Sequence, residues 1–435
     1  MQTIHMFKKE ILVILLTFSI LNAHKFSIRL KDTSIPQIAH AMFKSTDNHG
    51  DGFYTFLKMS LDNFEYINEM GMSTSAYDMR KGKGKKVKGV YGFSNQGYIT
   101  FSNQKNSLNN KFKFGRFYIN HGFGKTSKIF ISNHSRPFDG IGWNASYKKI
   151  EGKMYGIQLD PIENNNRYLS IHTIDFKFWD NITLSFGESS LYAGENRGIE
   201  LQYFNPTLFW IPVRENQPKT NQANGILYSG IKFAKEKYSI WSEFILDDFQ
   251  IDRSIQEPTT YGILFGMEIN KPIKMVDNLL IEYSRVSNRT YQTLGEFGQE
   301  NYVHRSFPIG HYLGNDFDHS MIVISFEKLR FSSYNILPKF SASLIRDGNE
   351  GIDTPWDQPW VLDENLIEDI YREDFPSPPL RIIFENETIV SITWDDRSFL
   401  DLGIFYQNID KEGHKSTDLR FLIRYNLVFN WNFLY

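Results

Sequence analysis

The C-terminal residues 419–435 alternate between two kinds of side chain. Most even positions carry arginine or asparagine, and every odd position is apolar: Leu419, Phe421, Ile423, Tyr425, Leu427, Phe429, Trp431, Phe433 and Tyr435. A period of two is the pattern of a β-strand. Ordinary strands run about 5–6 residues, so this length, the aromatic face and the aromatic last residue are typical of a strand that closes an outer-membrane β-barrel. An edge strand of a soluble sandwich fits these features less well.

The N-terminus has the pattern of a secretory signal peptide. Lys8 and Lys9 form a positive region, residues 11–20 are mostly apolar, and Ala23 offers a small residue for cleavage. This apolar run is too short for a membrane-spanning helix, which needs about 20 residues. We therefore expect residues 1–23 to be removed and residues 24–435 to form one outer-membrane domain, with 24–50 as a candidate periplasmic N-terminal segment.

Composition agrees with a barrel. No later run is apolar for long enough to form a transmembrane helix. Aromatic residues make up 16% of the chain, which suits lipid-facing positions and interfacial girdles. The chain has no cysteine, and its net charge of −2 gives no general attraction to nucleic acid.

Alternating segments recur along the chain, at 168–178, 182–187, 261–269 and 400–406. The mature length divided by roughly 20–25 residues per strand and connection gives about 18 strands, within a range of about 16–20. The sequence thus predicts an all-β fold, a transmembrane antiparallel β-barrel with long extracellular loops.

Two stretches do not alternate. Residues 350–379 are rich in acids and proline and predict a long loop that is extracellular or folded into the lumen. Residues 80–88 are strongly basic. This run forms either a solvated loop or a contact for the phosphates of lipopolysaccharide or for an acidic polysaccharide.

Catalytic and metal-binding patterns are weak. The chain has no Gly-x-Ser-x-Gly, His-Glu-x-x-His or Walker motif. A calcium-like start at 47–52 would place Lys58 where a bidentate glutamate is required. Asp247 and Asp248 are neighbours along a strand, so their side chains should point to opposite faces. We therefore expect no enzyme activity, no cofactor and no metal.

Four segments, taken in order, resemble one known family. They are 115–124 with 131–139, 184–190 with 201–206, 241–249, and 305–316. Together they are similar to motifs of the capsule assembly protein Wzi family of outer-membrane proteins, although residues before 110 and the loop 350–379 match poorly. The resemblance implies a barrel of about eighteen strands and a lectin-like role at the outer face.

Charged residues in these motifs are the candidate site residues. They have two interpretations: opposite charges that pair inside the lumen, or direct contacts to a glycan. The candidates are Arg116, His121, Arg136, Asp139, Glu188, Glu243 and Asp316. Trp356 and Trp360 in the long loop add aromatic faces beside Asp357, as glycan binding requires.

The leading functional hypothesis is a non-enzymatic outer-membrane barrel that binds or anchors capsular or other surface polysaccharide. Its expected partners are that polysaccharide, lipopolysaccharide and outer-membrane lipid, and the barrel-assembly machinery, with no nucleic acid. The alternatives are a porin or substrate-specific channel, and an outer-membrane hydrolase. A lumen filled by large side chains favours the first hypothesis, whereas an open constriction favours the channel.

Overall fold

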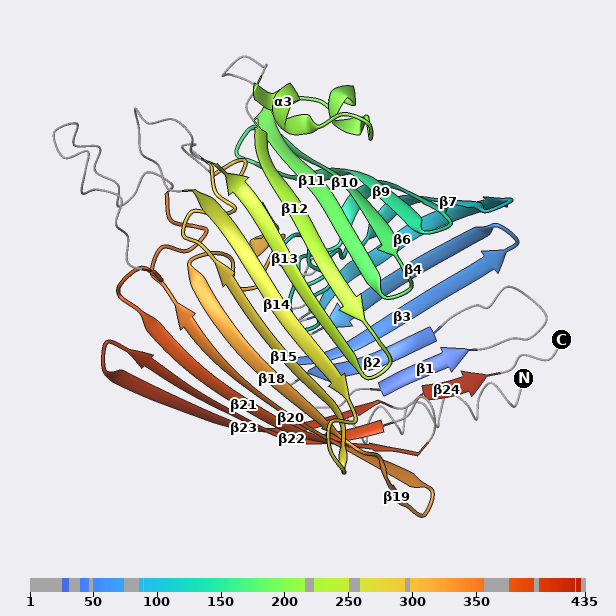
Figure 1. The fold of residues 1–435 in the computed structure, drawn as a ribbon. Coiled ribbons are helices and arrows are strands. Elements are labelled where there is room, and N and C mark those ends of the chain that lie inside the picture. Colours follow the sequence, from blue (N-terminus) through green and yellow to red (C-terminus); the bar gives the residue numbers. More distant parts are fainter. Residues whose placement is uncertain are drawn as a thin grey trace.

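A computed structural model describes most of the chain (Figure 1). The described residues are 26–30, 40–46, 50–73, 86–88, 90–215, 223–249, 259–293, 298–355, 375–394, 399–426 and 428–431. Trp356, Trp360, most of the 350–379 loop, most of the 80–88 run and the predicted signal peptide lie outside them.

Strands dominate this part of the chain. The N-terminal half contains β1 (Phe26–Leu30), β2 (His40–Thr46), β3 (Gly50–Leu61), β4 (Phe64–Ser73), β5 (Lys86–Val87), β6 (Val90–Lys105), β7 (Leu108–Phe117), β8 (Phe138–Tyr147), β9 (Ile150–Ile162), β10 (Asn165–Phe178) and β11 (Ile182–Glu195). Two short helices follow, η1 (Leu201–Phe204) and α3 (Trp210–Glu215). The C-terminal half contains β12 (Ala223–Ala234), β13 (Tyr238–Asp248), β14 (Thr260–Asn270), β15 (Val276–Val286), β16 (Val303–His304), β17 (Phe307–Pro308), β18 (Phe317–Phe326), β19 (Leu329–Phe331), β20 (Tyr334–Asp347), β21 (Arg381–Thr393), β22 (Phe399–Lys411), β23 (His414–Asn426) and β24 (Val428–Trp431).

One large sheet holds nearly all of these strands. In the described part of the chain it contains 22 strands. Four of them, β1, β5, β19 and β24, are five residues long or shorter, which leaves eighteen longer strands. Neighbouring strands pair antiparallel, and β1 joins the two ends by pairing antiparallel with β2 and parallel with β24. The predicted all-β antiparallel barrel of about eighteen strands is confirmed.

The two chain termini are described in part. Within the strand expected over 419–435, β23 extends to Asn426 and β24 covers Val428–Trp431, and residues 427 and 432–435 lie outside the described part. Strands β1 and β2 fall within 24–50, and both pair in the main sheet, where the sequence suggested a periplasmic segment.

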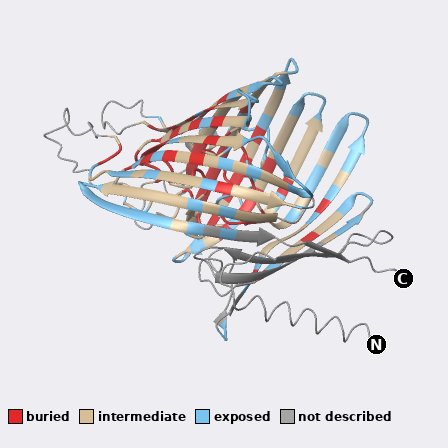
Figure 2. Ribbon diagram, turned by 90° about the horizontal axis from the view of Figure 1, so that it is seen from below, coloured by how far each residue is buried: buried red, intermediate tan, exposed pale blue. Residues whose placement is uncertain are grey.

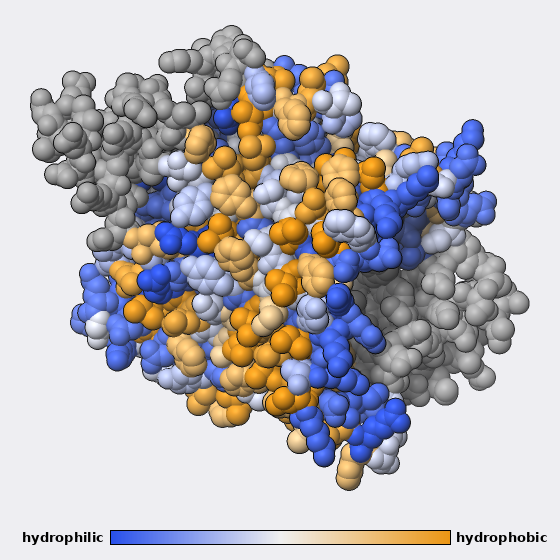
Figure 3. Space-filling view, in the orientation of Figure 1, coloured by the Kyte–Doolittle hydropathy of each residue, from blue (hydrophilic) through white to orange (hydrophobic). Residues whose placement is uncertain are grey.

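Period two assigns the two faces of the wall. Apolar side chains such as Phe244 (40% exposed) and Phe265 (49% exposed) alternate with the buried Glu243 and Leu264. On β23, Leu419, Phe421 and Ile423 are likewise exposed. Figure 3 shows apolar side chains gathered over the middle of the outer face and polar ones at its margins. This arrangement identifies the lipid-facing surface.

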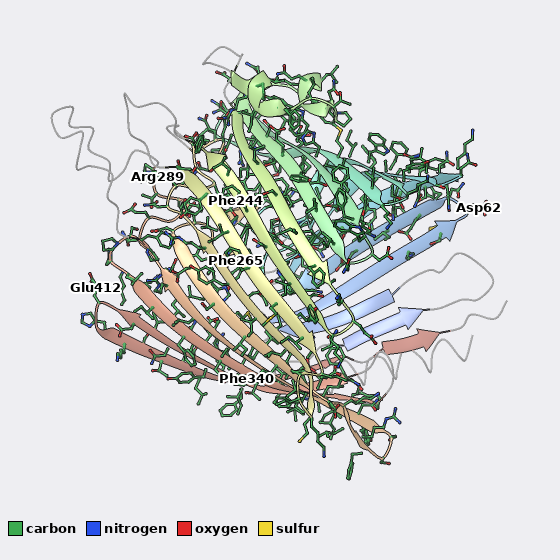
Figure 4. All side chains as sticks on the ribbon, in the orientation of Figure 1. Asp62, Phe244, Phe265, Arg289, Phe340 and Glu412 are labelled. Atoms are coloured by element: carbon green, nitrogen blue, oxygen red, sulfur yellow. The ribbon has the colours of Figure 1, made fainter. Side chains whose placement is uncertain are left out.

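The two ends of the barrel differ in their connections. Short turns lie at one end, where Asp62, Asn106, Lys148 and Trp179 adopt positive φ values between 39° and 56° to reverse the chain. Most of the long connections, including 118–137, 196–222 and 287–316, leave the other end. Figure 4 shows Asp62 and Glu412 at these opposite ends. Short turns are typical of the periplasmic side, so the long connections mark the extracellular mouth.

No helix among the described residues is long and apolar enough to cross a membrane.

The face assignment predicts unequal effects of two arginine substitutions. Phe265→Arg places a charge at the middle of β14 on the outer face. At mid-bilayer depth this charge should lower the free energy of unfolding by about 2–4 kcal/mol. Gln407→Arg is the matched control, because Gln407 faces the lumen and its amide lies 2.7 Å from the Glu385 carboxylate. Urea unfolding in lipid vesicles measures both costs. Equal losses would show that the faces are wrongly assigned.

Candidate functional site

The lumen loop, residues 118–137 between β7 and β8, folds inward and fills part of the barrel. Ile119, Ile129, Phe130 and Ile131 are almost fully buried in it. They join lumen-facing residues of the wall, such as Trp241, in one hydrophobic core. Figure 2 shows that buried residues concentrate on one side of the barrel. A second side, lined by β20–β22, keeps more accessible side chains.

Two carboxylates of the wall hold the backbone of the lumen loop. Glu243 on β13 accepts hydrogen bonds from the backbone N–H groups of Phe123 and Gly124, the latter at 2.6 Å. Glu282 on β15 accepts from the backbone of Lys125 and Thr126, at 2.6 and 2.5 Å. A buried loop cannot satisfy its own N–H groups as a strand does, so these acceptors offset the cost of burying it.

The rim segment, residues 287–316 between β15 and β18, lies over the lumen loop and contains the β16–β17 hairpin. Arg167 on β10 donates to the carbonyl oxygens of Gln299, Asn301 and Val303 at 2.5–3.0 Å. The backbone N–H of Ser132 donates to the carbonyl of Ile309 at 2.8 Å, which joins the rim segment to the lumen loop. The two segments therefore form one packed unit inside the mouth.

Three rings on this unit form the mouth patch: His134, Phe307 and Tyr312. The ring centroid of His134 lies 5.4 Å from that of Tyr312 and 6.4 Å from that of Phe307. His134 is exposed and the other two rings are partly exposed. The guanidinium of Arg136 lies 3.8 Å from the Phe307 ring centroid and fixes that ring from its buried side. Aromatic faces beside polar groups are the surface that a sugar ring can stack on.

The remaining candidate residues occupy different places. Arg116 forms a bidentate pair with Asp139 at 2.7 Å, on the outer face that it shares with the exposed Phe114. Arg305 of the rim segment extends the pair, 3.2 Å from Asp139 and 3.3 Å from Asp160. Opposite charges do pair as expected, but this network lies at the rim and on the outer face instead of inside the lumen.

Glu188 also differs from the lumen expectation. It shares the outer face of β11 with Phe186, and the outer segment, residues 196–215, covers it. Its carboxylate accepts the backbone N–H groups of Trp210 and Ile211 at 2.9 and 2.7 Å, and it lies 3.2 Å from His172. An uncovered carboxylate would be costly on a lipid-facing strand, so the outer segment explains its burial. Figure 1 shows α3 of this segment at the mouth ends of β11 and β12.

His121 and Asp316 have structural roles. His121 lies in the lumen loop, 2.9 Å from the Ser185 hydroxyl. Burial lowers the pKa of His121 from 6.5 to about 4, against the opposing attraction of Asp175. Asp316 accepts the backbone N–H groups of Ser377 and Glu350 at 3.0 and 3.1 Å, which ties both ends of the long 350–379 connection to the rim.

Sequence reasoning missed several residues that organise this site. Glu282, Arg167 and Arg305 anchor the inward segments, and Tyr312 contributes a ring to the mouth patch. Tyr312 and Arg305 lie within the 305–316 motif, which was a usable signal. Asp247 does not meet Asp248; it accepts the Tyr291 backbone N–H at 2.5 Å. Among the described residues, no group of three His, Asp or Glu side chains is placed to hold a metal.

Comparison with known proteins gives the family. The family described as capsule assembly protein Wzi matches residues 91–327, more than half of the chain. The chain belongs to the Wzi family. The resemblance found in the four sequence motifs is therefore confirmed, and the protein is an outer-membrane β-barrel. The comparison with curated proteins finds no match.

One solved structure, the first of the three that follow, supports the barrel fold. Wzi from Escherichia coli, described as a carbohydrate-binding β-barrel involved in group 1 capsule assembly, has 11% identity and a TM-score of 0.58, covering 91% of this chain and 80% of that one. OprD from Pseudomonas aeruginosa has 10% identity and a TM-score of 0.42, covering 88% and 90%. OccAB4 from Acinetobacter baumannii has 8% identity and a TM-score of 0.45, covering 89% and 94%.

The anchoring of the lumen loop predicts a graded mutational effect. Glu282→Ala removes the acceptor for two backbone N–H groups and for the Trp241 indole at 3.1 Å, and should cost about 3 kcal/mol or more. Glu268→Ala removes a 3.9 Å ion pair to Lys125 of the same loop and a hydrogen bond from the Asn278 side chain at 3.1 Å, but no acceptor for the loop backbone. It should therefore lower the free energy of unfolding by less than about 1 kcal/mol. Amide hydrogen exchange across residues 118–137 measures how much each substitution destabilises the lumen loop. Similar protection in the two variants would contradict the anchoring role of Glu282.

Acid should loosen the lumen loop. The folded-state pKa of His121 is lowered from 6.5 to about 4. The stability that neutral His121 contributes is therefore full above pH 6.5 and is lost as the pH falls through about 4. Hydrogen exchange of 118–137, corrected for the intrinsic rate at each pH, should show protection falling across this window. His121→Gln should flatten the fall, and an unchanged pH profile in that variant would assign the effect to other groups.

Proposed function

We propose that this barrel binds surface polysaccharide at its extracellular mouth and thereby retains it on the cell. The observation that carries the proposal is the mouth patch, which presents His134, Phe307 and Tyr312 on a packed support. Membership of the Wzi family supports the capsule assembly role. The description of Escherichia coli Wzi as a carbohydrate-binding barrel supports the ligand class.

The support of the patch favours binding over catalysis. Arg136 stacks on Phe307, and the ring of His311, which is fully buried, stacks on Tyr312 with centroids 4.7 Å apart. Rings held in this way lose little side-chain entropy when a sugar stacks on them. The role we propose is therefore non-enzymatic, and retention needs only binding.

The remaining expectations form part of the same proposal. Residues 1–23 direct export and are cleaved, and the barrel-assembly machinery recognises the C-terminal strand. The lipid-facing belt contacts outer-membrane lipid, and the basic run 80–88 contacts lipopolysaccharide phosphates. Trp356 and Trp360 provide further glycan contacts.

Retention of polysaccharide tests the proposal. Tyr312→Ala combined with His134→Ala should leave total polysaccharide unchanged and shift a larger fraction into the medium, because stacking on one aromatic face contributes about 1 kcal/mol. Phe331→Ala is the control, since Phe331 is 73% exposed at the short-turn end of the barrel. Reduced total polysaccharide would indicate a synthetic or hydrolytic role. Unchanged retention in the double variant would remove the mouth patch as the binding site.

A channel is the competing function, and one observation favours it. The lumen face of β20–β22 carries hydrogen-bonded polar side chains, including Ser343 and Gln407 around Glu385 at 3.3 and 2.7 Å. Such a row could line a water-filled path. If binding is the main role, purified protein in planar bilayers should show little steady conductance. Large, stable, ohmic steps would instead support a channel.

A further inference from the structure

The outer segment creates a second hydrophobic core, on the lipid-facing side of the wall. Tyr203 stacks on Tyr192 of β11 with ring centroids 4.8 Å apart, and Trp210 stacks on His172 of β10 at 4.1 Å. With Met154 of β9, the residues Tyr192, Tyr203 and Trp210 form a hydrophobic cluster separate from the lumen core. Residues 196–215 therefore fold back over the outside of the barrel near its mouth.

Two apolar cavities remain between this segment and the wall. The larger, about 560 Å³, lies under residues 206–209. Its lining includes Trp143, Met154, Ile174, Phe186, Phe244 and Leu208. The smaller, about 400 Å³, lies beside Phe204 and is lined by Phe101, Phe114 and Ile141. Trp143 and Met154 line both cavities, so the two are neighbours on one continuous surface.

Several residues that line this groove also belong to the lipid-facing surface. Phe186, Phe244 and Phe114 belong to the exposed apolar face that contacts the bilayer. The groove is therefore open to hydrocarbon rather than to water. Its volume falls in the range of about 300–1,000 Å³ that is usual for small-ligand sites.

The exposed side of the outer segment is also apolar. Leu201 is 82% exposed and Phe209 is 76% exposed. Two large apolar side chains presented outward from one short segment are typical of a segment at the membrane interface. The hydrogen bonds from Trp210 and Ile211 to Glu188 hold the segment in place above the groove.

From these observations we infer that the groove between the outer segment and strands β6–β13 holds a hydrocarbon chain of an outer-membrane lipid. The chain enters from the bilayer, lies against Trp143 and Phe186, and is covered by Leu208. A phospholipid and lipid A both supply such a chain, so the site recognises the acyl chain itself. This inference is independent of the proposed polysaccharide binding.

Filling the groove tests the inference. Gly152 of β9 lines the larger cavity, and a Cβ atom added there would meet only the Thr173 carbonyl oxygen at 3.9 Å. Gly152→Trp should therefore fold and occupy the space of the lipid chain. Ser320→Trp is the matched control, because Ser320 is exposed on β18 outside the groove.

Native mass spectrometry of the detergent-purified proteins gives the readout. The parent protein and Ser320→Trp should retain bound lipid, whereas Gly152→Trp should retain about tenfold less, since losing contact with only two methylene groups has an effect of this size. Heat-modifiable migration confirms that each barrel is folded. Reloading delipidated protein with phosphatidylglycerol or with lipid A distinguishes the two sources of the chain. Equal retention in both variants, or equal loss from both, would overturn the inference.

Discussion

The fold depends on one constraint: backbone N–H and C=O groups in hydrocarbon must find partners within the protein. The antiparallel ladder from β1 to β23 satisfies this for the wall, and the parallel pairing of β1 with β24 joins its ends. Because the wall strands satisfy each other's backbone groups, their side chains can bind other parts of the chain. Irregular segments buried against the wall have no neighbouring strand, so their backbone N–H groups need side-chain acceptors.

Carboxylates of the wall strands supply these acceptors at several places. Glu243 and Glu282 face the lumen and bind the lumen loop, while Glu188 faces outward and binds the start of α3. Asp316 of the rim segment, next to the start of β18, binds the two ends of the long 350–379 connection in the same way. In each case one carboxylate accepts two backbone N–H groups, so the buried charge and the unpaired backbone stabilise each other. The wall thus acts as a support for irregular segments on both of its faces.

The sequence predicts the wall well because period two needs no knowledge of the partner strand. Residues 261–269 became β14 and 168–178 became β10 within a few residues. The sequence predicts poorly whether a polar side chain of the wall faces the lumen or the outside. Glu188 looked like a lumen residue because an acid on a lipid-facing strand is costly, and nothing local shows that residues 196–215 return to cover it. Glu282 gave no signal, because its partners lie 156–157 positions away. Contacts of that range are set by tertiary folding.

Strands β8–β11 connect the inner and outer surfaces. On β11, Ser185 meets His121 of the lumen loop, whereas Glu188 meets α3 on the opposite face. Arg305 of the rim segment reaches Asp139 and Asp160 on the outer side of β8 and β9. The mouth patch is therefore attached to strands whose outer faces carry the lipid groove. Because these strands are hydrogen-bonded along their length, a glycan held at the mouth and a lipid chain held outside would be attached to the same rigid part of the wall. This arrangement fits a protein that anchors a polymer to the membrane, since a load on the mouth patch would pass directly to the lipid-contacting wall.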